Sequence, residues 1–158
     1  MLQQAKNSFL RTSSWIWVQE ARRRGIQVAA NVRFNGRPIL RPCKGSSISI
    51  GEGSSLNSYR TSNPLLCAHP VSMRTTTANA KIVVGPGVGI SSAVLSAAAL
   101  IEIGAGTLVG AGAMIIDNDF HEWSEADARW GRIGEGNARP VVIGENAFIG
   151  ARAIILKG

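Results

Sequence analysis

An aliphatic residue followed by glycine recurs every six residues through most of this chain. Ile103-Gly-Ala-Gly-Thr-Leu is followed directly by Val109-Gly-Ala-Gly-Ala-Met, and Ile143-Gly-Glu-Asn-Ala-Phe by Ile149-Gly-Ala-Arg-Ala-Ile. A period of six is neither the 3.6 of an α-helix nor the simple alternation of one strand. It is typical of a chain that forms a short strand, turns a corner and then repeats both, so that each side of a coil places one aliphatic side chain in the interior. The period therefore predicts a coiled solenoid.

Grouped by threes, the repeats form five sets, which we expect to be five stacked coils. Glycine after the aliphatic residue permits the backbone conformation that a corner needs. Three positions break the rule, Pro38, Ser62 and Ser96, and each is the third of its set. Small residues four places after an aliphatic one fit a narrow interior: Ser54, Thr107, Ala113, Ala147 and Ala153. The five sets are 26/32/38, 50/56/62, 84/90/96, 103/109/115 and 143/149/155.

Composition excludes several protein classes. With 45% hydrophobic and 17% charged residues, the chain is neither disordered nor membrane-spanning. Aromatic residues at 6% beside 18 glycines disfavour an aromatic-centred sandwich or a helical bundle. The first residues do not form a secretory signal, and the two cysteines, Cys43 and Cys67, are interpreted as ordinary buried thiols. These features predict a cytoplasmic protein of one domain with an appendage.

Positive charge is concentrated in the first half of the chain. Residues 1–74 hold eleven basic and two acidic residues, whereas residues 75–158 hold six and eight. Such a surface can attract phosphates, anionic polysaccharide, lipid headgroups or nucleic acid. Arg22-Arg-Arg24 is the only basic run, and no aromatic residues interleave with it as in a nucleic-acid module. Nucleic acid is therefore not expected as a partner.

Residues 1–25 lie outside the repeats, so residues 26–158 form the predicted solenoid. Ser13-Ser14, the basic run and Gly25 predict a short helix with a serine cap and a glycine stop. We expect this helix to cover the open first coil, as a solenoid requires. Its alternative role is a peripheral membrane or partner anchor that uses Trp15, Trp17 and Arg22–Arg24.

Two insertions interrupt the repeats, at 63–83 and 117–142. Long loops without regular structure in a compact domain are usually functional. Ile133-Gly-Glu-Gly inside the second insertion imitates a repeat but is out of phase with Ile143, and is interpreted as loop.

The Ile/Val-Gly-x-x-small-x signature resembles that of the hexapeptide-repeat acyltransferases over residues 26–158. The resemblance implies an all-β solenoid: a left-handed parallel β-helix of about five coils, triangular in section, with a short N-terminal helical cap. It also implies a homotrimer, and we expect further association through the open last coil, since its edge is exposed. A γ-class carbonic anhydrase shares this fold, but it needs three zinc-binding histidines, and the chain has two. We therefore expect no metal.

The segment from Asp117 to His121 resembles the Asp-x-x-x-His segment of sugar and polysaccharide O-acetyltransferases of the maltose, galactoside and colanic-acid type. The resemblance implies that His121 is the general base toward a saccharide hydroxyl in polysaccharide biosynthesis, with Asp119 or Asp117 orienting its ring. Imidazole titrates near neutrality and suits this role, although a lone loop histidine is often a solvated bystander. The expected acceptor-binding residues are Asn118, Trp123, His69 and Arg74.

The donor that the resemblance implies is acetyl-CoA, bound between neighbouring subunits of a trimer. Phe148, Gly150 and Ala151 match family positions near the thioester arm. Relatives continue past the Ile155-Leu-Lys-Gly158 segment with at least one more coil, which this sequence lacks. The alternative is therefore a non-catalytic trimeric β-helix that acts as a binding or scaffold protein. A third possibility is acetylation of an antibiotic-like hydroxyl.

Overall fold

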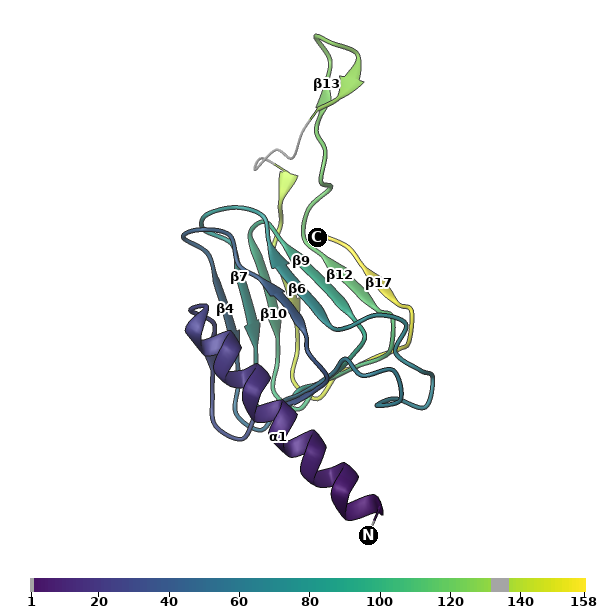
Figure 1. Ribbon diagram of the computed structural model, residues 1–158. Helices are drawn as coiled ribbons and strands as arrows, with labels where there is room; N and C mark the ends of the chain where they lie inside the picture. Colours follow the sequence, from purple (N-terminus) through teal and green to yellow (C-terminus); the bar gives the residue numbers. More distant parts are fainter. Residues whose placement is uncertain (1, 132–136) are drawn as a thin grey trace.

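Three parallel sheets form the body of the protein (Figure 1). The computed structural model describes residues 2–131 and 137–158. Sheet A contains β1 (Gln27–Val28), β4 (Ser47–Ile50), β7 (Lys81–Val84), β10 (Leu100–Ile103) and β15 (Val141–Ile143). Sheet B contains β2 (Arg33–Asn35), β5 (Ser55–Asn57), β8 (Gly89–Ser91), β11 (Leu108–Val109) and β16 (Phe148–Ile149). Sheet C contains β3 (Ile39–Arg41), β6 (Ser72–Thr75), β9 (Val94–Ala97), β12 (Met114–Ile116) and β17 (Ile154–Ile155).

Within sheets A, B and C, consecutive strands belong to different sheets, and each strand pairs in parallel with the equivalent strand of the next coil. The chain therefore winds through sheets A, B and C in turn. This arrangement is a left-handed parallel β-helix of five coils, which confirms the predicted fold class. The helix α1 (Leu2–Arg23) lies across the first coil (Figure 1).

Strand register stacks the apolar side chains in three columns. The residues of these columns are apolar in all five coils. In the first coil they are Val28, Phe34 and Leu40, so the predicted 26/32/38 was wrong by two residues. The predicted third positions Ser62 and Ser96 were also wrong. Met73 and Leu95 occupy that column instead. The columns are 28/50/84/103/143, 34/56/90/109/149 and 40/73/95/115/155.

The interior is narrow, as the small residues predicted. Ser54 and Thr107 are fully buried, and their hydroxyls bind backbone groups of the next coil. Ser54 Oγ donates to the Gly85 carbonyl at 2.9 Å, and Thr107 Oγ1 donates to the Gly144 carbonyl at 2.8 Å. These bonds satisfy buried polar groups at two levels of one corner.

Glycine after the aliphatic residue has a different reason from the predicted one. Gly104 and Gly110 do not have the positive φ that favours glycine. A Cβ at Gly104 would lie 2.5 Å from the Glu145 nitrogen, and one at Gly110 would lie 2.6 Å from the Ala151 nitrogen. Close approach of the next coil therefore requires glycine at these positions, whereas the left-handed conformation occurs two residues later, as at Gly106.

Helix α1 begins at Leu2, so Ser13 and Ser14 lie inside it and the predicted serine cap was wrong. Ser14 is buried, and its Oγ accepts a hydrogen bond from the Phe34 backbone nitrogen at 2.8 Å. Val18 and Ala21, on the same face, are buried in the core. The helix therefore covers the outermost strands β1 and β2 of their sheets.

The predicted glycine stop is confirmed. Gly25 has a φ of 81°, and its nitrogen donates to the Arg22 carbonyl at 3.0 Å. The Ile26 nitrogen donates to the Ala21 carbonyl at 3.1 Å. This pair of bonds is a Schellman motif, which ends the helix and turns the chain into the first coil.

The two insertions differ from their predicted bounds. Strand β6 and most of β7 lie within the predicted 63–83, so the first insertion is residues 58–71. The second insertion is residues 117–140, and it contains a hairpin of β13 (Trp123–Ser124) and β14 (Arg129–Trp130) that projects from the body (Figure 1). The predicted loop at Ile133-Gly-Glu-Gly lies outside the described residues. Within the described residues, no helix has the length and hydropathy to cross a membrane.

Candidate functional site

The second insertion starts at a buried aspartate. Asp117 is fully buried, and its carboxylate accepts hydrogen bonds from the Ala98 and Ala99 backbone nitrogens, both at 2.7 Å. Asn118 Nδ2 donates to the same carboxylate at 2.9 Å, and Asn118 Oδ1 accepts from the Phe120 nitrogen at 2.9 Å. In this structure Asp117 and Asn118 therefore hold the start of the insertion against the preceding coil, and neither hydrogen-bonds the His121 ring.

His121 is exposed, and its ring is held across the projecting hairpin. Its Nδ1 lies 2.8 Å from the Gly131 carbonyl oxygen. A carbonyl only accepts, so Nδ1 carries the proton of the neutral ring and Nε2 carries the lone pair. The Gly131 nitrogen donates to the Glu122 carbonyl at 2.7 Å, which fixes the two arms of the hairpin. A backbone carbonyl, not the expected carboxylate, thus orients an imidazole whose Nε2 can accept a proton.

Asp119 pairs with a lysine that no sequence motif indicated. Lys157 Nζ forms an ion pair with Asp119 Oδ2 and donates to the Asn137 carbonyl at 2.8 Å. Asp119 and Asn137 lie on opposite arms of the second insertion, so Lys157 joins the two arms. The Asp119 carbonyl also accepts a bond from the His121 backbone nitrogen at 2.7 Å. The last coil is thereby connected to the backbone of His121.

Two tryptophans lie beside His121 in the hairpin. The rings of Trp123 and Trp130 are 5.5 Å apart between centroids and meet edge to face at 69°. Trp130 is 67% exposed and lines an open hollow with His121, Arg129 and Gly131. Trp123 was a predicted acceptor residue, whereas Trp130 and Arg129 were missed. The sequence signal that could have indicated Trp130 was its position opposite Trp123 across a short polar segment, a pattern typical of a hairpin.

His69 and Arg74 lie elsewhere on the β-helix. His69 belongs to the first insertion, at the corner between sheets B and C, whereas His121 follows β12 at the corner between sheets C and A. The His69 ring Nδ1 lies 2.9 Å from the carbonyl of its neighbour Pro70. Arg74 is exposed on β6 in register with Arg41. One chain does not bring either residue into the hollow beside His121.

The predicted donor residues are on the last coil. Phe148 is 75% exposed on β16, in register with the exposed Leu108 of β11. Ala151 follows Gly150 at the corner between sheets B and C, and it lines a hollow with Leu65 and Leu66 of the first insertion. The candidate base and the candidate donor residues therefore lie at different corners of one chain.

Comparison with protein-family models, with curated proteins and with solved structures finds no match to this chain. The parallel β-helix is accordingly shown by the structure alone. The likeness to acyltransferases rests on the repeat signature and on the segment that ends at His121.

Proposed function

We propose that this protein is an O-acyltransferase that moves an acetyl group from acetyl-CoA to a hydroxyl of a saccharide-like acceptor. The observation that carries the proposal is the His121 ring, whose Nδ1 is held by the Gly131 carbonyl so that Nε2 carries a lone pair in an open hollow. The exposed Trp130 ring in the same hollow offers an apolar face for the body of an acceptor.

His121 would act as the general base. Its Nε2 takes the proton of the acceptor hydroxyl as the oxygen attacks the thioester carbonyl carbon. The carbon–sulfur bond then breaks, the acetyl group stays on the acceptor oxygen, and the imidazolium returns its proton to the departing CoA thiolate. The Gly131 carbonyl keeps the ring in place through both proton transfers, because Nδ1–H remains its donor.

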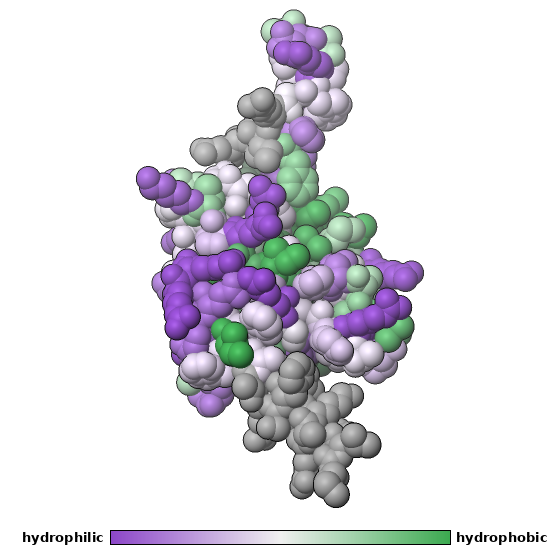
Figure 2. All heavy atoms as spheres, viewed as in Figure 1, coloured by the Kyte–Doolittle hydropathy of each residue, from purple (hydrophilic) through white to green (hydrophobic). Residues whose placement is uncertain are grey.

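A neighbouring subunit would complete this site. Phe148 and Ala151 lie at other parts of the chain than His121, so a donor bound there reaches a base only across an interface between subunits. The outer face of sheet C carries exposed apolar side chains suited to such an interface, among them Met114, Ile154 and Leu156. Figure 2 shows apolar residues gathered over this part of the surface. We therefore include a homotrimer in the proposal.

The test is release of free CoA thiol from acetyl-CoA in the presence of a panel of saccharides and one aromatic, antibiotic-like alcohol. We expect acceptor-dependent thiol release that falls about a hundredfold or more in His121→Ala, since a general base contributes that much. Undiminished release in His121→Ala would remove the mechanism, and release with the aromatic alcohol alone would change the acceptor class.

A non-catalytic scaffold is the second candidate. The observation that favours it is the separation of His121 from the donor residues within one chain. Calorimetric titration with acetyl-CoA distinguishes the two functions. Binding in the micromolar range supports the transferase, whereas a stable trimer without detectable binding at millimolar acetyl-CoA supports the scaffold.

A further inference from the structure

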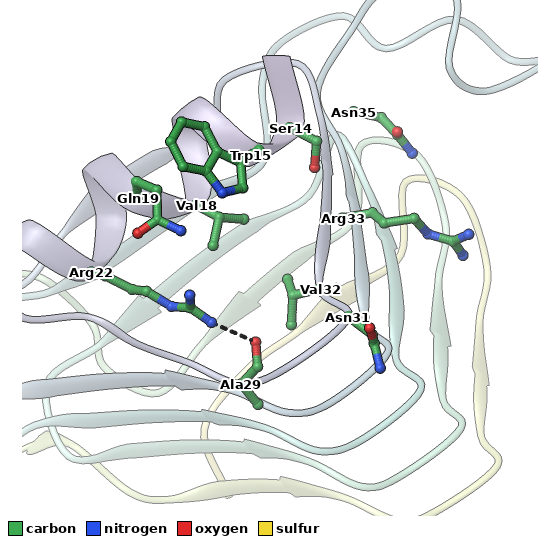
Figure 3. A pocket seen from close by; sticks show the side chains of 10 residues that line it. All are labelled: Ser14, Trp15, Val18, Gln19, Arg22, Ala29, Asn31, Val32, Arg33 and Asn35. Atoms are coloured by element: carbon green, nitrogen blue, oxygen red, sulfur yellow. Dashed lines mark hydrogen bonds between the residues drawn. The ribbon is translucent and has the colours of Figure 1, made fainter. Parts of the chain in front are cut away.

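A groove of about 520 Å³ lies between α1 and the first coil (Figure 3). Trp15 and Arg22 line its helical side, and Asn31 and Arg33 line the side of the coil. Val18 and Val32 lie between these two sides (Figure 3). A space of this volume matches the usual size of small-molecule sites.

The groove is cationic. Arg22 donates from Nε and Nη2 to the Val28 carbonyl at 3.1 and 2.8 Å, and from Nη2 to the Ala29 carbonyl at 3.0 Å. These bonds fix the plane of its guanidinium and leave Nη1 without a partner among the described atoms. The Arg33 guanidinium makes no hydrogen bond or ion pair within residues 2–131 and 137–158.

Carboxylates do not neutralise these two arginines. None of the described residues that line the groove is acidic. Glu52 lies near one end and accepts a bond from Asn31 Nδ2 at 3.2 Å. Glu20 of α1 pairs instead with Arg37 and Arg24, and its hydrogen bond to Arg37 lowers the pKa of the Glu20 carboxyl. The groove therefore keeps an uncompensated positive charge.

An apolar surface accompanies this charge. Trp15 is 64% exposed and lines the groove, so its indole offers apolar surface to a ligand. Val18 and Val32 are buried and close the groove beneath it. The ligand that matches both features has an apolar or planar part and an oxyanion. Phosphate is such an oxyanion, and it can accept hydrogen bonds from the two N–H groups of the free Nη1 of Arg22.

We propose that this groove binds a small organic phosphate, with its apolar part against Trp15 and its phosphate on the free Nη1 of Arg22. The proposal is independent of acetyl transfer, because no residue of the groove belongs to the candidate site in the second insertion. Its location on the basic N-terminal half raises the local concentration of anions.

The experiment is calorimetric titration of the full chain with phenyl phosphate, inorganic phosphate and phenol at physiological ionic strength. We expect phenyl phosphate to bind at least about tenfold more tightly than either of its parts, because it contacts the indole and the guanidinium together. Equal affinity for phenyl phosphate and inorganic phosphate would overturn the proposal.

Two variants and a matched control locate the binding. Trp15→Ala and Arg33→Gln change exposed side chains without hydrogen bonds in the described structure. Trp15→Ala should weaken phenyl phosphate about tenfold, because the apolar part loses its surface, whereas Arg33→Gln removes only a neighbouring charge and should weaken it about twofold. Arg23→Gln is the control, because Arg23 is exposed beside Arg22 but does not line the groove. Weakening in Arg23→Gln as large as in Trp15→Ala would show general attraction to a basic surface and overturn the proposal. Binding to vesicles of anionic phospholipid without binding to phenyl phosphate would assign the surface to a membrane instead, and also overturn the proposal.

Discussion

The two insertions each carry one histidine, and they hold it in different surroundings. The first insertion lies along its corner, where Ser92 Oγ donates to the His69 carbonyl at 2.7 Å and accepts from the His69 nitrogen at 3.2 Å. The second is fixed at its start by Asp117 and then projects as a hairpin. In both, ring Nδ1 faces a backbone carbonyl.

The comparison shows that the tautomer alone does not select a base. His69 is half-buried and bonded to the adjacent residue, whereas His121 is exposed in a hollow with Trp130 and Arg129. What differs is the room for an acceptor beside Nε2. The following variants test this difference, starting with the largest expected effect.

Asp117→Ala should destabilise the protein by about 3 kcal/mol, because the Ala98 and Ala99 nitrogens lose their acceptor in a buried position. Urea unfolding measures the change. Asp119→Ala is the control, since Asp119 makes an exposed ion pair and should cost less than about 1 kcal/mol. Equal losses from the two variants would show that Asp117 does not anchor the insertion.

His121→Ala and His69→Ala should differ about a hundredfold in acceptor-dependent thiol release, with His69→Ala within about twofold of the unchanged protein. The reason is that only His121 lines a hollow open to an acceptor. Initial rates at saturating acetyl-CoA provide the measurement. The opposite ranking would transfer the proposed base to the first insertion.

Ser92→Ala should cost about 1 to 2 kcal/mol of stability and leave thiol release unchanged. Ser92 is fully buried, and its hydroxyl pairs both backbone groups of His69. Thermal unfolding and the thiol assay on the same sample separate the two effects. A loss of activity at unchanged stability would contradict a purely structural first insertion.

Lys157→Met should slow turnover about fivefold and leave the affinity for acetyl-CoA unchanged. The lysine joins the two arms of the second insertion through Asp119 and Asn137, and its loss lets His121 leave its position. Steady-state kinetics give the turnover, and Lys157→Arg is expected to restore most of it. If Lys157→Met lowers only the free energy of unfolding and leaves turnover unchanged, Lys157 stabilises the fold and does not position His121.

Much of the body follows from the period of six, but the phase of the first coil does not. Ile26 and Val32 also lie six apart and are also buried, so the first coil offers two phases, and only register shows that Val28 and Phe34 form the column. Met73 completes the second coil although counting Ile, Leu and Val alone misses it.

The candidate site was less predictable because its contacts are distant in sequence. His121 is oriented by a backbone carbonyl ten residues away, which no side-chain motif reveals. Lys157 and Asp119 are separated by 38 residues and meet only after a full coil has formed. The sequence indicated His121 as a candidate base by its residue type. The groups that bond His121 and Asp119 could be found only from the path of the folded chain.

Helix α1 has a consequence for how these molecules behave at high concentration. Ser14 and Arg22 occupy backbone groups of Phe34, Val28 and Ala29 on the outermost strands. Such groups, when free, recruit strands of other chains into growing fibres. We therefore expect the helix to block the addition of another chain's strand at this end of the solenoid, because two of its side chains already bind these groups.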